Sequence, residues 1–213
     1  TLNHFADHGW QGAIVEPMKK YLNNIPQKPN VHYLNYAVDN KIGTRTLYHA
    51  SDATVNEDKD FAGMSSFLPP RPAYEVLTEE TVVNTLTFEK ILEFTGFTRI
   101  DYLKIDVEEY DLELLKIFPF DIVKPEFIKI EYWHLGEEPF VNILHKQGYH
   151  CEISDRDIYF RVNVGGSSVD AIIIDASDVG AVKLPNDNQV LYIGAGNDIY
   201  FVHYDNSTSV WGN

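Results

Sequence analysis

One stretch, residues 100–116, constrains the fold more than any other part of the sequence. It begins with an apolar run rich in β-branched residues, Asp101–Val107, which is typical of a strand buried on both faces of a sheet. Leucines at helical spacing follow, so the stretch predicts a strand that leads directly into a helix. Four acids lie at the junction: Asp106, Glu108, Glu109 and Asp111. They either cap the positive end of the helix or line a ligand site, because open α/β sheets bind ligands at the carboxyl ends of their strands.

Strand and helix patterns alternate through residues 1–162, which predicts an α/β fold with a doubly wound, mostly parallel sheet. Further strands are expected over Gly12–Pro17, Val31–Val38, Glu80–Leu86 and Pro125–Tyr132. A hairpin-like turn after Val38 predicts that Thr44–His49 pairs with the strand before it. Residues 50–74 are polar and then proline-rich, which is typical of a long loop acting as a lid.

Two of these expected strands also end in an acid, Glu16 and Glu131. Because parallel strands present their carboxyl ends at one edge, we expect Glu16, Asp106 and Glu131 to face the same crevice. In that arrangement Glu109 and Asp111 serve to cap the following helix.

Residues 163–213 differ in composition from the part before them. They are rich in Gly, Asn and Asp and contain strand-like runs at Ala171–Ile174, Val190–Ile193 and Ile199–Tyr204. We therefore expect two parts, an α/β domain over residues 1–162 and an antiparallel, β-rich extension over residues 163–213.

The net charge bears on the possible partners, and the cysteine content bears on disulfides and on the cellular compartment. The 213 residues include 17 Lys and Arg against 32 Asp and Glu, a net charge of −15, without a basic cluster. Binding to nucleic acid or to an anionic membrane is therefore not expected. The single cysteine, Cys151, excludes an internal disulfide and fits a reducing compartment, so we expect a cytoplasmic protein.

Several sequence motifs occur together along the chain. The most specific is Leu-Lys-Ile-Asp-Val-Glu at residues 103–108. The others are Gly12–Pro17, Asn35–Val38, Ser65-Ser66, Asn84–Leu92 and Gly148-Tyr149. Together these motifs resemble the FkbM family of S-adenosylmethionine-dependent methyltransferases. The resemblance covers residues 1–162 and implies a Rossmann-like domain that binds S-adenosylmethionine. It also implies transfer of a methyl group to a hydroxyl of a small molecule or sugar.

Three departures from the family pattern stand beside these matches. Glu109 replaces a glycine, Thr87 replaces an acid, and the Gly-rich cofactor loop is missing from its usual place. We expect the first strand and that loop to lie upstream of Thr1. In a permuted chain, residues 190–198 could instead supply the first strand and the Gly-rich loop. A strand-like run follows them, however, which favours a Gly-rich turn within the extension. A catalytically inactive binding module with the same fold is the alternative to an enzyme.

The strand ends supply the candidate site residues. Glu16 is expected to accept hydrogen bonds from the cofactor ribose, with Ala37 and Val38 lining the adenine pocket. Asp106 would lie beside the transferred methyl group and orient the acceptor, take its proton or bind a divalent cation, unless its role is structural.

The strand after Asp106 supplies two further candidates. Glu131 and His134 would act in catalysis, with His134 as a general base. Asp106, Glu108 and Glu131, together with His134, could also form an oxygen-rich site for a divalent cation.

Overall fold

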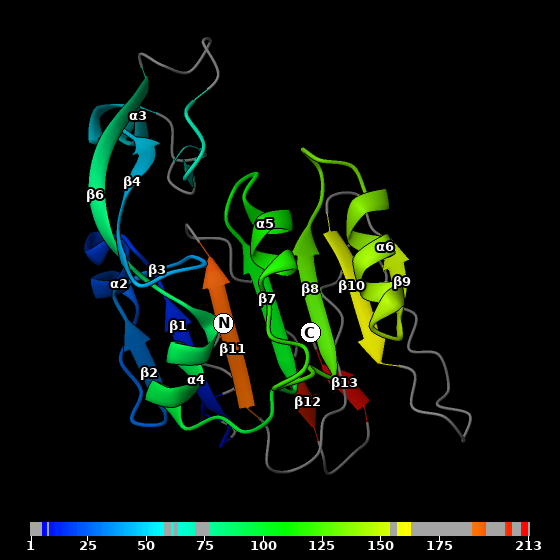
Figure 1. Ribbon diagram of the computed structural model, residues 1–213. Coiled ribbons are helices and arrows are strands. Elements are labelled where there is room, and N and C mark those ends of the chain that lie inside the picture. The colour runs from blue at the N-terminus through cyan, green and yellow to red at the C-terminus, as the bar shows by residue number, and fades with distance from the viewer. Residues whose placement is uncertain are drawn as a thin grey trace.

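In a computed structural model, the described part of the chain forms a mixed α/β structure with three β-sheets (Figure 1). The structure describes residues 6–7, 9–57, 61, 64–70, 77–153 and 157–162, and the backbone of three later strands. Those three strands are β11 (Gln189–Gly194), β12 (His203–Asp205) and β13 (Val210–Gly212). No helix in this described part is long and apolar enough to cross a membrane.

The largest sheet has seven strands in the order β2-β1-β11-β7-β8-β10-β9. Its other strands are β1 (Gln11–Val15), β2 (Val31–Leu34), β7 (Tyr102–Asp106), β8 (Phe127–Glu131), β9 (Tyr149–Ile153) and β10 (Asp157–Val162). Neighbours from β2 to β8 pair in parallel, whereas β10 is antiparallel to both β8 and β9. The expected mostly parallel sheet is therefore present, but the sheets are mixed and a fully parallel, doubly wound sheet is not formed. The short connection from β9 to β10 explains the difference, because only antiparallel strands can be joined by a tight turn.

The main core lies between this sheet and three helices on one of its faces (Figure 1). The helices are α4 (Phe88–Thr95), α5 (Asp111–Lys116) and α6 (Glu138–Lys146). Leu103 and Ile105 of β7 are fully buried against them. On the opposite face, Ile14 of β1 packs against Leu22 of helix α2 (Lys19–Asn24). The expected strand–helix unit over residues 100–116 is thus confirmed as β7 followed by α5.

A second sheet lies beyond the carboxyl ends of β1 and β2 (Figure 1). Its order is β3 (Ala37–Val38), β6 (Thr78–Leu86), β4 (Gly43–Ala50) and β5 (Ser65–Ser66). The predicted hairpin between Val31–Val38 and Thr44–His49 is wrong, because β4 pairs with β6 and β5 instead. Helix α3 (Asp52–Glu57) and β5 interrupt the segment expected to be a loop.

The side chain of Asn35 explains why the strand expected over Val31–Val38 is divided between two sheets. Its Nδ2 donates hydrogen bonds to the carbonyl oxygens of Glu16, at 3.0 Å, and Pro17, at 2.8 Å. The chain is therefore fixed where it leaves β2, and Ala37 and Val38 pair with β6.

Strand β11 lies at the centre of the large sheet, although it comes from the C-terminal part of the sequence (Figure 1). It pairs in parallel with β1 and β7, so that Ile193 is opposite Val15 and Gly194 is opposite Asp106. Our assignment of this run to an antiparallel extension is wrong. A strand with neighbours on both sides satisfies its backbone N–H and C=O groups along both edges, which a turn in an extension would not.

Other parts of the expected extension have different outcomes. Strands β12 and β13 do form a separate antiparallel pair. The run Ala171–Ile174 and the Gly-rich residues 195–198 lie outside the described residues. The division of the chain at residue 162 therefore stays a prediction.

Candidate functional site

The carboxyl ends of four parallel strands meet at one edge of the large sheet. β1 leads into Glu16, β11 ends at Gly194, β7 ends at Asp106 and β8 ends at Glu131. The three acids expected at this edge are therefore there, and Gly194 lies between the strands of Glu16 and Asp106.

Glu16 is buried in the turn that follows β1, with 4% of its surface exposed. Its Oε1 accepts a hydrogen bond from the backbone N–H of Met18 at 2.7 Å, and its own backbone N–H donates to Leu34 O at 3.0 Å. These contacts fix the carboxylate beside the end of β11. Its role as a ribose ligand stays a prediction.

Ala37 and Val38, the residues expected around adenine, are also buried. They line a narrow, mainly apolar cavity together with Val15, Pro17 and Val107. The volume of this cavity is about 30 Å³, enough for about one water molecule and too small for an adenine ring. The adenine role of Ala37 and Val38 therefore stays a prediction.

Asp106 has a lysine partner that the sequence patterns did not reveal. The Nζ of Lys104 lies 2.7 Å from Asp106 Oδ2, and Lys104 is buried. Residues i and i+2 of a strand share one face, so spacing alone could have suggested this pair. The charge of Asp106 is thereby balanced within its own strand.

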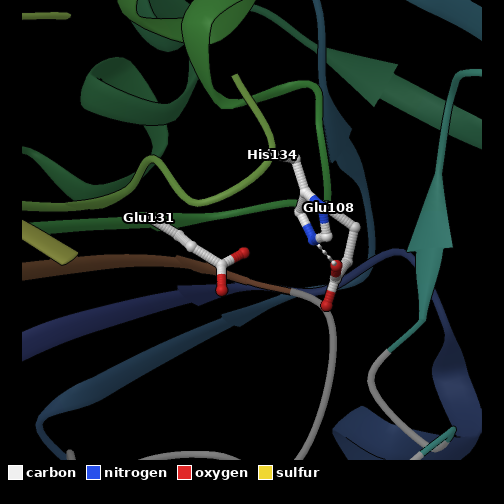
Figure 2. Close-up of side chains that lie close together, drawn as sticks. All are labelled: Glu108, Glu131 and His134. Atoms are coloured by element: carbon white, nitrogen blue, oxygen red, sulfur yellow. Dashed lines mark ion pairs between the residues drawn. The ribbon is translucent and has the colours of Figure 1, made fainter. Parts of the chain in front are cut away.

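Glu108, Glu131 and His134 form a separate cluster at the same edge (Figure 2). One ligand atom from each residue lies within 4.8 Å of those of the other two. His134 Nε2 is 3.8 Å from Glu108 Oε2, and His134 Nδ1 is 3.8 Å from Glu109 Oε1. Of the four residues expected to share a cation, the structure groups these three and leaves Asp106 out.

Burial and neighbouring acids perturb two carboxyl groups at this edge. Burial, followed by the charges of Glu131 and Asp106, raises the pKa of Glu108 to about 8. Burial, followed by the charge of Asp106, raises the pKa of Asp111 to about 8. Such shifts mark a place where protons or a cation stabilise the folded protein, and they are frequent at functional sites.

The backbone between β7 and α5 is strained. Glu108 has φ 49° and Glu109 has φ 69°, in the left-handed region that favours glycine. This conformation explains why the resembling family has glycine at the position of Glu109. A strained backbone at a strand end is a common feature of functional sites.

The two expected capping residues have different roles. Asp111 lies in the first turn of α5, and its Oδ1 accepts a hydrogen bond from Val107 N–H at 3.1 Å. Glu109 instead directs its carboxylate to His134. Thr87, the other departure from the family pattern, caps α4 by accepting a hydrogen bond from Lys90 N–H at 3.3 Å.

A cavity of about 280 Å³ lies beside the Glu108 cluster. Its polar lining comes from the second sheet and from the turns after β7 and β8: Ser65, Ser66, Thr78, Glu108, Glu109 and His134. The hydroxyl of Ser65 is buried and has no hydrogen-bond partner among the described residues. The sequence marked Ser65 only as part of a family motif, and its place in the wall of this cavity depends on the pairing of β5 with β4.

Arg45 joins the second sheet to the start of α5. Its guanidinium group lies 4.2 Å from the ring centre of Phe67 and 4.8 Å from that of Tyr110. Its Nη1 donates hydrogen bonds to Tyr110 Oη at 2.8 Å and to the buried Asp39 Oδ1 at 3.1 Å. Sequence reasoning missed this cluster because its members are far apart in the chain.

Comparison with known proteins agrees with this geometry. No curated protein and no solved structure matches the chain. The family model of the methyltransferase FkbM domain matches residues 1–151, which include β1, β7, β8 and the acids at their ends. Since this match covers more than half of the sequence and agrees with the resemblance in its motifs, the chain belongs to the FkbM family of methyltransferases.

Proposed function

We propose that the protein binds S-adenosylmethionine at the carboxyl edge of the large sheet, where β11 lies between β1 and β7. The observation that carries this proposal is the central position of β11, with Gly194 opposite Asp106. If β11 is counted as the first strand, β2-β1-β11-β7-β8 has the order 3-2-1-4-5 of Rossmann-like nucleotide-binding sheets. Ligands of such sheets bind beside the first strand, where the backbone of a glycine permits close approach.

The arrangement of the acids supports a direction for the cofactor. Glu16 follows the strand on one side of β11, as a ribose ligand would, and Asp106 ends the strand on the other side. The adenosine would then lie over β1, near Ala37 and Val38, and the sulfonium methyl group near Asp106. The Lys104–Asp106 pair would hold the carboxylate in place at that point.

The acceptor in this proposal is a hydroxyl of a small molecule or sugar in the cavity beside Glu108. A volume of about 280 Å³ lies near the lower end of the range for small-molecule pockets. The bound cofactor would supply its methyl group to the acceptor oxygen as the carbon–sulfur bond breaks, and Asp106 or His134 would take the hydroxyl proton. The products are a methyl ether and S-adenosylhomocysteine. Glu108 and Glu109, each 3.8 Å from one ring nitrogen, would orient the imidazole, and alignment of the reactants would supply much of the rate.

Two of the departures from the family pattern, Thr87 and Glu109, do not favour an inactive module. Thr87 still caps α4 through its hydroxyl, and Glu109 adopts the backbone conformation of the glycine that it replaces. Both positions therefore keep the local structure that the family residues provide.

Titration calorimetry of the full chain with S-adenosylmethionine and S-adenosylhomocysteine tests the proposal. Both ligands are expected to bind. Glu16→Gln is expected to weaken binding by about tenfold, because a hydrogen bond from the ribose to a charged group contributes about 1.5–3 kcal/mol. The amide oxygen of glutamine can still accept the Met18 N–H, so the turn is retained. Glu93→Gln, at an exposed position of α4, is the matched control, and this variant should bind both ligands as the wild type does. If neither ligand gave a heat of binding, the cofactor assignment would be refuted.

A further inference from the structure

We propose that Glu108, Glu131 and His134 bind one divalent first-row transition-metal ion, such as Mn²⁺ or Zn²⁺, at the wall of the 280 Å³ cavity. Glu131 is the last residue of β8, and Glu108 and His134 lie in the turns that follow β7 and β8. The two strands are adjacent and parallel. Figure 2 shows their side chains close together at this edge.

The distances between the ligand atoms of the three residues are close to those around a bound metal ion. Two ligand atoms at about 2.1 Å from a common ion lie roughly 3.0–4.2 Å apart, depending on the angle at the metal. The Glu108–His134 separation of 3.8 Å falls within this range. The limit of 4.8 Å for the whole group exceeds the upper end of the range by about 0.6 Å, so a small movement of one side chain would bring all three atoms within it. Glutamate side chains can make such a change by rotation about single bonds.

The composition of the cluster selects the class of ion. Mg²⁺ and Ca²⁺ prefer ligand sets made only of oxygen, whereas an imidazole nitrogen beside carboxylates suits Mn²⁺, Fe²⁺ and Zn²⁺. Asp106 is left out of the ligand set because Lys104 Nζ lies 2.7 Å from its Oδ2. An ion here would also compensate the charge of Glu108 and Glu131 next to Asp106.

An independent observation indicates that the cavity takes a polar ligand. Ser65, which lines the cavity together with Glu108 and His134, is 5% exposed, and its hydroxyl has no hydrogen-bond partner among the described residues. A buried hydroxyl without a partner is costly, and native structures usually satisfy it. Three protein ligands also leave positions on the ion open to the cavity. On the basis of the proposed function, the oxygen of the methyl acceptor would occupy an open position. With His134 bound to the ion, the hydroxyl proton would pass to Asp106.

Metal binding can be measured without the cofactor or the acceptor. The full chain is treated with EDTA, dialysed and titrated with MnCl₂, with free Mn²⁺ followed by electron paramagnetic resonance and ZnCl₂ binding followed by calorimetry. One ion per chain is expected. Glu131→Gln and His134→Ala should each weaken binding by more than about tenfold, since even groups that only orient metal ligands contribute that much. Glu113→Gln, an exposed acid on α5, is the control and should bind as the wild type does.

Two results would overturn the metal site. One is the absence of saturable binding by a chain whose circular dichroism shows that it is folded. The other is unchanged affinity in both ligand variants. Because these titrations contain no S-adenosylmethionine, a metal-binding protein that fails to bind the cofactor would refute the proposed function and leave the metal site standing.

Discussion

Replacing Arg45 by alanine tests whether the second sheet is held over the candidate site by one cluster. The guanidinium group donates to Asp39 and Tyr110 and lies against the rings of Phe67 and Tyr110. Phe67 and Tyr110 in turn line the cavity that contains Ala37 and Val38. Arg45→Ala therefore removes a connection between β4 and α5 that shapes the site.

The expected loss of stability follows from these contacts. A hydrogen bond to a charged group contributes about 1.5–3 kcal/mol, and a partly exposed cation–π contact adds about 0.5–1 kcal/mol. Asp39 is 3% exposed and would keep the backbone N–H of Asn40 and the hydroxyl of Tyr110 as partners. We therefore expect Arg45→Ala to lower the free energy of unfolding by about 3 kcal/mol. For a chain of this size that corresponds to a decrease in Tm of about 6–12 °C.

Urea unfolding followed by circular dichroism measures the effect, with Lys116→Ala as the control. Lys116 forms an exposed i,i+3 pair with Glu113, so its removal should cost less than about 0.5 kcal/mol. In an Asp39→Asn background, the loss of Arg45 should cost about 1–2 kcal/mol less, because no carboxylate is left without its cation. A loss below about 1 kcal/mol in Arg45→Ala, or full additivity of the two changes, would refute this reasoning.

Three further substitutions test other features by denaturant unfolding. Glu109→Gly should raise the free energy of unfolding by about 0.5–1 kcal/mol, because it relieves the left-handed backbone at φ 69°, and a net loss would contradict that cause. Asp111→Asn should gain stability relative to the wild type as pH rises from about 4 to about 8. In that window the folded wild type keeps a proton on Asp111 that the unfolded chain releases, so its free energy of unfolding falls by up to about 1.4 kcal/mol per pH unit relative to the variant. Parallel pH profiles of the two proteins would contradict this reasoning. Tyr149→Phe should cost about 1 kcal/mol through loss of the hydrogen bond to Pro125 O at 2.6 Å, and an unchanged midpoint would show that this bond contributes nothing.

Local patterns in the sequence predicted much of the fold correctly. The apolar run before Asp106 forms β7, and the leucines after it form α5. Strands were also expected over Gly12–Pro17 and Pro125–Tyr132, where β1 and β8 lie. These features depend on residues close together in the chain, so periodicity and capping were sufficient to find them.

The candidate site could be predicted only as a set of strand ends. Parallel strands bring their carboxyl ends to one edge, and this rule alone placed Glu16, Asp106 and Glu131 at the same edge. The rule gives no side-chain partners, so it did not reveal that Lys104 pairs with Asp106 or that Glu108 lies with His134. The contact between Glu108 and His134 depends on the conformation of two turns and on the left-handed backbone at Glu108.

The sequence by itself determined the family, the strand–helix units and the acids at the strand ends, because each depends on residue order over a few turns or strands. Only the tertiary structure decided which strands pair. An apolar run such as Val190–Ile193 is equally suited to an edge and to the centre of a sheet, and its place depends on an open position between β1 and β7. The pairing of β4 with β6 was decided in the same way, by long-range hydrogen bonds that residue patterns do not specify. The position of β11, and with it the proposed cofactor site, is therefore a property of the folded chain.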